Sequence, residues 1–405
     1  MSAELPRLAY IGDVSVSATA HGSALLYRLF ENYPPNKLLI FEPNLRSSEP
    51  HSPPTRLKGF HYSCIPFPLT RLFKTRFSRI ARSVYFLVSW LFARRFASLL
   101  DPMPIDGIVT VSNGILWYPA FLYARSRKLL FYMIIHDDIL LCSNNPFERA
   151  IYLKRFRAAY LYATRAFCIC DTMQNFYSKL FKKESLTLWP VRAASAFDVP
   201  QRKEYNHNAQ RDLNIGYAGS INSEEYAKMI SRLADLKSDY NIKVLIYGPH
   251  SISSLSLIGL GCDNIYLMGN LSSDDLVLSL RDNVDILYLP IPFSRISRNI
   301  ARYSFPSKLV DYTRVGIPIL AQAPHYSSLT SWLNLSPHAA YLVGTLNSSD
   351  LEKGIRHIIE NDYSSYSKGA LDAGRECFDY YKVTRTFFQA LSHESDQPSH
   401  SPVNC

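Results

Sequence analysis

Short apolar segments alternate with helical segments along most of the first half of the chain, and this alternation limits the fold more than any other feature. An apolar segment such as 129–135 (LLFYMII) reads as a buried strand, and 8–12 reads as a strand that ends in a glycine turn. The expected strands cover 8–12, 37–41, 108–111, 129–135 and 167–169, and the expected helices cover 21–31, 146–164 and 172–181. Strands separated by helices pair in parallel, so we expect an α/β fold with helices on both faces of a sheet.

The same alternation begins again after residues 198–211 (DVPQRKEYNHNAQR), a polar stretch that reads as a linker between two domains. Its expected strands cover 213–218, 243–247, 265–268, 285–289 and 319–321, and its expected helices cover 222–236, 273–280, 306–314, 351–360 and 375–391. Asn222 is the expected N-cap of its helix, because Glu225 three residues later completes a capping box. Parallel sheets bind ligands beyond the carboxyl ends of their strands, so we expect a cleft between the two domains.

The expected domains follow from this linker. An N-terminal domain covers 1–200, and a C-terminal domain covers 201–391, with a last helix that is able to cross back to the first domain. The polar residues 392–405 read as a disordered tail.

Composition excludes several classes of protein. The 405 residues are 47% hydrophobic, which excludes disorder of the whole chain. The seven cysteines are odd in number, form no C-x-x-C pair and belong to no Cys/His cluster of zinc spacing. The N-terminal residues show no signal peptide, and no apolar run reaches the roughly eighteen residues of a membrane span. We therefore expect a cytoplasmic protein without a bound metal.

Positive charge is concentrated in the first half of the chain. Residues 1–200 contain 25 Lys and Arg against 13 Asp and Glu, whereas residues 201–405 contain 19 against 21. The stretch 50–100 has nine basic residues and no acid, and residues 72–90 show a helical pattern with an apolar and a basic face. Such a helix suits an anionic membrane surface, and a core-facing helix with a solvated basic face is the alternative. No nucleic-acid-binding motif accompanies the charge, so we expect no nucleic acid partner.

The segment 288–321 contains the most informative polar residues. Its basic loop contains Arg295, Arg298 and Arg302. A helix is expected to open at Pro306 with Ser307 as its cap, and Lys308 is unfavourable at such a helix start unless an anion binds there. We therefore interpret Ser307, Lys308 and a nearby arginine as a diphosphate site, and Asp311 as an acceptor for ribose hydroxyls. The alternative is a solvated Lys308 and an Asp311 that only favours the helix dipole.

Residues 305–312 (FPSKLVDY), followed by 316–319 (GIPI), resemble the nucleotide-binding signature of GT-B glycosyltransferases of the family 4 type, also called glycosyl transferases group 1. The usual form of that signature is P-S-K-[LI]-x-E-Y-x-x-x-G-x-P-[VI]. The resemblance implies two Rossmann-like, doubly wound domains that face a central cleft, with the acceptor in the first and the nucleotide-sugar in the second. It also implies that Asp311 holds the ribose. The first acid of the family's E-x(7)-E pair falls at Tyr303 and is absent.

The resemblance also implies further donor-binding residues. Segment 215–221 (IGYAGSI) resembles the opening strand and glycine turn of the family's C-terminal domain, which places Gly219 and Ser220 beside the donor. A glycine there lets the backbone approach a phosphate, although Glu224 and Glu225 at the next helix start disfavour one. Arg302, or one of its neighbouring arginines, then supplies the positive charge for the phosphate.

In the first domain, the resemblance concerns two strand ends. His136 and Asp137 follow the strand 129–135 and resemble the family's His-Asp, in which the histidine approaches the donor sugar and the departing phosphate. Asp137 then contacts sugar hydroxyls or orients His136. Gly12, His21 and Gly22 after the first strand are implied on the acceptor side. The alternatives are a structural histidine at a strand end, a simple turn glycine at 12, and a metal-dependent phosphohydrolase site whose other ligands the sequence does not supply.

The activity implied by the resemblance is transfer of a hexose from a UDP- or GDP-linked donor to a hydroxyl of a polysaccharide or lipid-linked glycan, with retention of configuration and no cofactor beyond the donor. The basic, aromatic residues 56–96 indicate peripheral contact with an anionic membrane, at its inner face. Two other hypotheses stay open at this point: a GT-B scaffold of reduced activity at a membrane, and a nucleotide-sugar epimerase. The motifs G-x-S-x-G and H-E-x-x-H and the Walker loop do not occur in the sequence.

Overall fold

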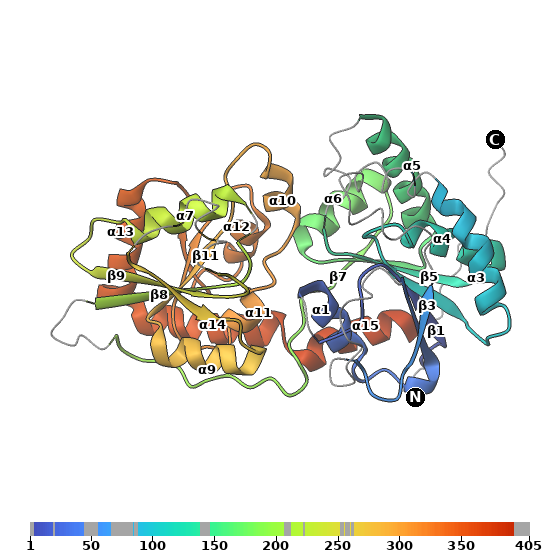
Figure 1. The fold of residues 1–405 in the computed structure, drawn as a ribbon, viewed down its shortest axis with the longest axis horizontal. Coiled ribbons are helices and arrows are strands. Elements are labelled where there is room, and N and C mark those ends of the chain that lie inside the picture. The colour runs from blue at the N-terminus through green and yellow to red at the C-terminus, as the bar shows by residue number, and fades with distance from the viewer. Residues whose placement is uncertain are drawn as a thin grey trace. The chain divides into compact units, whose positions relative to one another are not determined.

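The computed structural model describes residues 4–18, 21–43, 56–65, 84, 88–137, 146–205, 212–221, 223–251, 255, 260 and 263–392. These residues form two compact units, each built on its own parallel sheet (Figure 1). The first unit contains the described residues up to Ile169, residues 174–188 and the described residues from Val383 on. The second unit contains residues 170–173 and the described part of 189–382.

The sheet of the first unit has seven strands in the order β3-β2-β1-β4-β5-β6-β7, all parallel. The strands are β1 Leu8–Ile11, β2 Leu38–Pro43, β3 His61–Ile65, β4 Gly107–Val111, β5 Leu130–Ile135, β6 Arg165–Cys168 and β7 Leu186–Thr187. The central strands β1 and β4 are buried along their whole length. Continuous apolar runs are typical of strands that helices cover on both faces.

Helices cover both faces of this sheet. They are α1 His21–Phe30, α3 Phe92–Leu100, α4 Trp117–Arg127, α5 Pro146–Tyr162, α6 Asp171–Phe181 and α15 Tyr380–Ser392, with 3-10 turns at η1 Pro35–Lys37 and η4 Ser89–Leu91. Figure 1 shows α4, α5 and α6 along one face and α1 and α15 along the other. Helix α15 begins in the second unit, and from Val383 on it belongs to the first.

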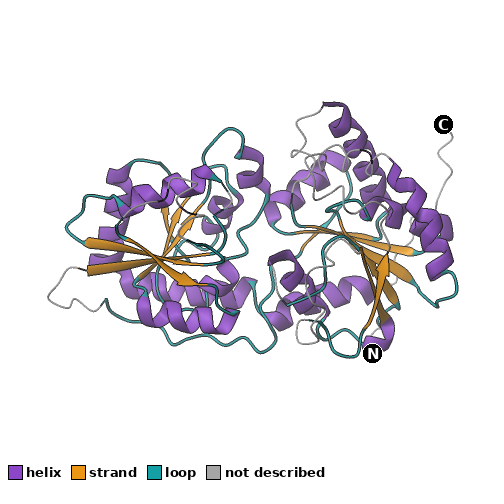
Figure 2. Cartoon of the chain, in the orientation of Figure 1, coloured by secondary structure: helices purple, strands orange, loops and turns teal. Residues whose placement is uncertain are grey.

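The sheet of the second unit has six parallel strands in the order β10-β9-β8-β11-β12-β13, between two layers of helices (Figure 2). The strands are β8 Asp212–Ala218, β9 Asn241–Tyr247, β10 Ile265–Gly269, β11 Ile286–Pro290, β12 Ile319–Gln322 and β13 Tyr341–Val343. The helices are α7 Glu224–Ala234, α9 Ser273–Asn283, α10 Arg298–Tyr303, α11 Leu309–Tyr312, α12 Ser328–Leu333, α13 Ser348–His357, the π-helical η6 Ile358–Asp362 and α14 Tyr363–Cys377.

Two parallel sheets, each flanked by helices, confirm the α/β class expected from the sequence. The ten expected strands occur, with ends that shift by one or two residues. Several elements were not predicted, among them β3, β7, β13, α3, α4, α10 and α12. The prediction of one helix over 375–391 is wrong. The chain breaks between α14 and α15 because Phe378 is completely buried against the rings of Trp189, Phe305 and Trp332.

Two further expectations concern helix starts and the membrane. Asn222 lies outside the described residues, and the N-cap of α7 is Ser223, whose hydroxyl accepts from the amide of Tyr226. The expected amphipathic helix over 72–90 also lies outside them, apart from residues 84 and 88–90, and so does the tail from 393 on. In the described part of the chain, no helix has both the length and the apolar character to cross a bilayer. The described cysteines Cys64, Cys168, Cys170 and Cys377 form no disulfide.

Candidate functional site

Gly219 and Lys308 lie in contact at the carboxyl edge of the second sheet. Gly219 follows β8 and has a φ of +122°, a conformation that glycine adopts without strain. A Cβ atom added at Gly219 would lie 2.5 Å from Cε and 3.2 Å from Nζ of Lys308. The space that a side chain at 219 would fill is therefore occupied by Lys308. The structure thus brings together two residues that are far apart in the sequence and that the sequence predicts at a donor site.

Aromatic groups hold the amine of Lys308. Its Nζ donates to the hydroxyl of Tyr217 at 2.5 Å and lies 3.9 Å from the centre of that ring. The ring of Tyr226 lies 5.6 Å away, and the Tyr217 hydroxyl donates onward to the carbonyl of Ser220 at 2.8 Å. Burial lowers the pKa of Lys308 to about 7, because a phenol compensates a desolvated ammonium less than a carboxylate does. An anion at Nζ would favour the charged form again.

The carboxylate of Asp311 is oriented by polar neighbours. Its Oδ1 accepts from the hydroxyl of Ser273 at 2.7 Å and lies 3.6 Å from Nη1 of Arg314. The buried guanidinium of Arg314 also contacts Ser273 at 3.2 Å, Asp274 at 2.7 Å and the carbonyl of Phe197 at 2.9 Å. Because 22% of its side-chain surface stays exposed, Asp311 has not turned into apolar packing.

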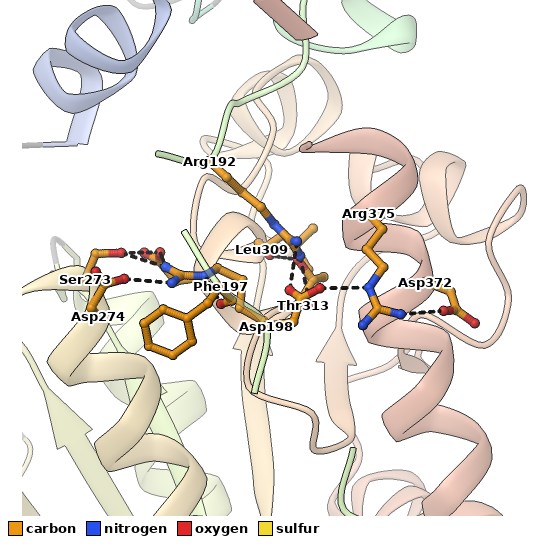
Figure 3. A network of polar contacts seen from close by, with 11 residues as sticks. Arg192, Phe197, Asp198, Ser273, Asp274, Leu309, Thr313, Asp372 and Arg375 are labelled. Carbon is orange, nitrogen blue, oxygen red and sulfur yellow. Dashed lines mark hydrogen bonds and ion pairs between the residues drawn. The ribbon is translucent and has the colours of Figure 1, made fainter. Parts of the chain in front are cut away.

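A second polar cluster fixes the turn after Asp311. Arg192 donates to the carbonyl of Thr313 at 2.9 Å and to its hydroxyl at 3.2 Å, and pairs with Asp198 at 2.8 Å (Figure 3). Asp198 also pairs with Arg375 at 2.8 Å. Burial lowers the pKa of Arg192, and the ion pair with Asp198 opposes that shift. The main chain that carries Asp311 is therefore held by charged groups from residues far away in the sequence.

The helix that contains Lys308 differs from the prediction of a helix over 306–314 capped by Ser307. Helix α11 covers only Leu309–Tyr312, no side chain caps it, and Ser307 is exposed. The amides of Leu309 and Val310 donate to carbonyls three residues back, so the chain enters α11 through a tight turn. The buried Tyr312 fixes this turn, because its hydroxyl accepts from the amide of Ala218 at 2.7 Å and donates to the carbonyl of Tyr288 at 3.3 Å.

The arginine loop before α11 is exposed. The guanidinium of Arg302 lies 5.4 Å from the ring centre of Tyr303, and that of Arg298 lies 4.9 Å from the ring centre of Tyr326. Arg302 keeps an exposed side chain, whereas Tyr303 is only 5% exposed. Tyr303 thus packs into the interior at the position where the family that the sequence resembles has its first acid.

Glu225 holds the loop that leads to these arginines, a role that sequence reasoning missed. Its Oε1 accepts from the amides of Phe293 and Ser294, both at 2.6 Å, and its Oε2 accepts from the hydroxyl of Ser297 at 3.1 Å. Its expected role in a capping box is therefore wrong. The signal in the sequence was the pair of acids Glu224 and Glu225 at a helix start. Of these two, Glu225 makes the contacts with the loop.

His250 is a second residue that was not predicted at this edge of the sheet. Its Nε2 lies 3.1 Å from the carbonyl oxygen of Gly219. Gly248, two residues earlier, has a φ of +155°, and a Cβ atom added there would lie 2.9 Å from the same oxygen. The turns after β8 and β9 therefore pack closely beside Lys308.

In the first unit, Asp13 joins two strand ends, and it too was not predicted. Its Oδ2 accepts from the amides of Ile115 and Leu116, both at 2.7 Å, at the start of α4. Gly114 has a φ of +78°, and a side chain there would overlap the Asp13 carboxylate. Burial raises the pKa of Asp13 to about 6, although the two amides act in the opposite direction. This carboxylate therefore fixes the turns after β1 and β4 to each other.

His136 follows β5, which is the neighbour of β4, so it lies at the same edge of the sheet as Asp13. Burial lowers the pKa of His136 to about 4, against the opposing effect of the charge on Asp137, so the imidazole is neutral at physiological pH. Asp137 is exposed. Within the described ranges, no three His, Cys, Asp or Glu residues are placed to hold a metal ion.

The residues predicted on the acceptor side follow β1. A side chain at Gly12 would overlap the ring of Tyr10, whose hydroxyl donates to the carbonyl of Val14. Gly22 lies in the first turn of α1, where an added Cβ would make an ordinary contact with Val14. His21 is the first residue of α1, and its side chain lies outside the described part of the structure. Glycine at position 12 thus has a packing reason, whereas position 22 has room for a larger side chain's Cβ atom.

No protein-family model and no curated protein sequence matches this chain. Solved structures do match it over nearly its full length. Anabaena HepE in complex with UDP and glucose gives a TM-score of 0.65 at 11% identity, with 96% of this chain and 99% of HepE covered. The lipopolysaccharide outer core galactosyltransferase WaaB gives 0.62 at 15% identity, with 95% and 98% covered.

The α,α-trehalose-phosphate synthase (UDP-forming) of Burkholderia vietnamiensis is similar as well, with a TM-score of 0.63 at 12% identity and with 95% of this chain and 99% of the synthase covered. All three proteins have the GT-B glycosyltransferase fold. The present chain therefore has this fold, as the two Rossmann-like α/β units indicate on their own.

Proposed function

We propose that this protein transfers a hexose from a UDP- or GDP-linked sugar to a hydroxyl of a polysaccharide or lipid-linked glycan, with retention of configuration. The observation that carries the proposal is the contact between Gly219 and Lys308, where an amine with a pKa near 7 lies beside a glycine turn. A bound diphosphate places its negative charge beside this amine. Preorganised positive charge of this kind stabilises a departing diphosphate in the transition state.

The other donor-site residues take roles around this amine. Asp311, oriented by Ser273 and Arg314, accepts the ribose hydroxyls, and Ser220, Arg302 and Ser307 complete the donor site. These assignments rest on the resemblance in sequence and on the polar surroundings of Asp311.

In the first unit, His136 approaches the donor sugar and Asp137 contacts its hydroxyls. Gly12, His21 and Gly22 lie on the acceptor side. The reaction needs no metal and no cofactor besides the donor, because Lys308 and the exposed arginines supply the positive charge.

Nucleotide binding tests the proposal directly. UDP or GDP should raise the melting temperature of the wild type by several degrees, since a ligand at a hundred times its Kd adds about 2.7 kcal/mol to stability. Gly219→Ala should lose this shift, because the added Cβ displaces Lys308. Gly344→Ala is the matched control, because a Cβ atom there meets nothing within 4 Å. The proposal fails if neither nucleotide shifts the wild type.

Asp311→Ala separates the nucleoside from the diphosphate. We expect it to weaken binding of UDP or GDP while inorganic pyrophosphate binds as in the wild type, because the ribose contact alone is lost. Equal losses for nucleotide and pyrophosphate would contradict the ribose role of Asp311.

A scaffold of reduced activity at a membrane is the second candidate. The buried Tyr303 favours it, because the resembling family has an acid at that position. Release of UDP or GDP from a nucleotide-sugar in the presence of acceptor distinguishes the two functions. Nucleotide binding without any turnover across a panel of donors would favour the scaffold.

We also propose that the protein works at the inner face of an anionic membrane. The sequence stretch 56–96 supports this contact through its basic and aromatic residues, of which the structure describes 56–65, 84 and 88–96.

A further inference from the structure

Helix α3 and the end of the 3-10 turn η4 before it expose a stripe of alternating apolar and basic residues. Leu91, Arg95 and Leu99 recur at four-residue spacing and are all exposed, and Trp90 and Arg94 beside them are exposed as well. The adjoining face of α3 contains Phe92, Phe96 and Leu100, which are buried. The hydrophobic core therefore accounts for Phe92, Phe96 and Leu100, whereas Leu91 and Leu99 keep 44% and 37% of their surface exposed.

Helix α5 repeats this pattern. Arg149, Leu153, Arg157 and Leu161 recur at four-residue spacing along its exposed face, and Lys154 is exposed next to them. Its buried face packs through Phe156 and Tyr160 on the rings of Tyr177 and Phe181 in α6. Four-residue spacing keeps the four stripe residues on one side of the helix.

The two helices belong to the same layer of the first unit. Arg155 of α5 donates to the hydroxyl of Ser89 in η4 at 3.2 Å, and its guanidinium lies 4.4 Å from the ring centre of Tyr118 in α4. Helix α4 packs against both α3 and α5. Trp90 and Leu91 therefore lie in the segment that α5 contacts, and the two stripes belong to one layer of helices.

The charge of this layer is mostly positive. Helices α3, α4 and α5 contain two, two and four Lys or Arg residues and a single acid, Glu148. Asp101, just after α3, already pairs with Arg127. Anionic lipid headgroups complement such a surface, and the exposed leucines and Trp90 suit the boundary between headgroups and acyl chains. A nucleic acid would match the arginines but would leave the leucines without a role.

We propose that the outer faces of η4, α3 and α5 form one docking surface for an anionic lipid bilayer, with Trp90 and the leucines inserted and the arginines at the headgroups. This surface is defined by Trp90, Leu91, Arg94, Arg95, Leu99, Arg149, Leu153, Lys154, Arg157 and Leu161. It extends beyond the stretch 56–96 to residues of α5. Its test needs no donor or acceptor, so its failure and failure of the proposed transfer reaction are distinguishable.

Flotation of the full chain with vesicles tests whether the basic residues of this surface bind anionic lipids. We expect the wild type to bind phosphatidylcholine vesicles that contain about 30% phosphatidylglycerol and to bind phosphatidylcholine alone much more weakly. The Arg149→Gln/Arg157→Gln variant should bind the anionic vesicles roughly 20- to 30-fold more weakly, as expected for two lost headgroup contacts. Lys237→Gln/Lys368→Gln in the second unit removes the same net charge from exposed positions and should bind like the wild type.

Quenching of tryptophan fluorescence tests whether Trp90 inserts into the bilayer. Trp90 is 47% exposed, Trp117 and Trp332 are buried, and Trp189 of the second unit is partly buried against Phe305, so brominated acyl chains should quench mainly Trp90. Trp90→Phe should keep vesicle binding and lose most of the quenching. Leu153→Ser/Leu161→Ser should weaken binding, with Leu335→Ser, 75% exposed in the second unit, as the matched control.

Three results would overturn the proposal. The first is equal binding of the wild type to neutral and anionic vesicles. The second is binding of the arginine and leucine variants at the level of their controls. The third is binding to duplex DNA with steep salt dependence, without binding to vesicles. All substituted residues are exposed, so melting temperatures should match the wild type. The arginine variant and the leucine variant change different positions of α5, so weaker vesicle binding by both would be two separate lines of support for the surface.

Discussion

Lys308 is a cation that the protein holds against a phenol ring rather than a carboxylate. Burial brings its pKa from an ordinary 10.5 to about 7 in the folded chain. Between those two pH values the unfolded chain binds more protons than the folded one. The free energy of unfolding therefore rises with pH across this window, and the destabilising contribution is complete below about pH 7.

Replacement of this amine should stabilise the empty protein. We expect Lys308→Met to raise the free energy of unfolding at pH 6–7 by about 1–3 kcal/mol, allowing for partial exposure, and to have less effect as the pH approaches 10. The same variant should lose the thermal shift with UDP or GDP. Urea unfolding at several pH values measures the first effect, and exposed Lys353→Met is the control. A variant that is less stable than the wild type at pH 6 would contradict the burial argument.

The sequence indicated part of this site because its local signals were strong. Gly219 stands at the end of an apolar strand, and Lys308 stands out at a helix start. Glu225, His250 and Asp13 could not be assigned, because each of them contacts a main chain far away in the sequence. Such contacts depend on strand order, which a single sequence does not show.

At the scale of elements, the loop between β11 and α10 is held from outside by one carboxylate. Glu225 in the first turn of α7 accepts from two amides and one hydroxyl of this loop. Hydrogen bonds to a charged acceptor are stronger than those between neutral groups. The position of the exposed arginines in α10 therefore depends on the first turn of α7.

Removal of this carboxylate should loosen the loop selectively. In Glu225→Ala we expect the amides of Phe293 and Ser294 to exchange hydrogen at least about tenfold faster, with a loss of about 1–3 kcal/mol in stability. Binding of UDP or GDP should weaken as well, because Arg298 and Arg302 follow this loop. Hydrogen exchange with mass spectrometry measures the first effect.

Glu224→Ala is the matched control for that experiment. Glu224 neighbours Glu225 on the same helix turn but is exposed and pairs with Lys228 at 3.4 Å. Equal exchange rates in the two variants would show that Glu225 does not hold the loop.

Elements with a clear period were predictable, and elements between them were not. The buried strands β1, β5, β8 and β11 follow directly from their apolar runs. Helix α4 was missed because it is apolar around most of its surface, with α3 and α5 packed beside it. Helix α11 is shorter than its pattern indicates, because Tyr312 ties the segment to the sheet.

At the scale of the whole molecule, the C-terminal helix belongs to the core of the N-terminal unit. Phe387 is completely buried, 6.0 Å from the ring centre of Phe30 and 5.2 Å from that of Phe167. The hydroxyl of Tyr132 in β5 donates to the carbonyl of Leu391 at 3.1 Å. Residues from both ends of the sequence thus share one hydrophobic core.

Truncation of this ring should destabilise the first unit. We expect Phe387→Ala to cost about 3–5 kcal/mol, the usual range for a buried phenylalanine. Unfolding in urea, followed by hydrogen exchange in β1 and β5, measures the loss. Tyr381→Ala, 66% exposed on the same helix, should be close to neutral. Equal losses in the two variants would place Phe387 outside the core.

Helix α15 also has a consequence for the order of events during synthesis. Residues 380–392 leave the ribosome after all the strands of both sheets. Until they do, the hydrophobic surface around Phe30 and Phe167 has no Phe387 to cover it. Domains usually fold one after another from the N-terminus as the chain emerges. In this protein, the part that is made first can complete its packing only after the second unit has been made.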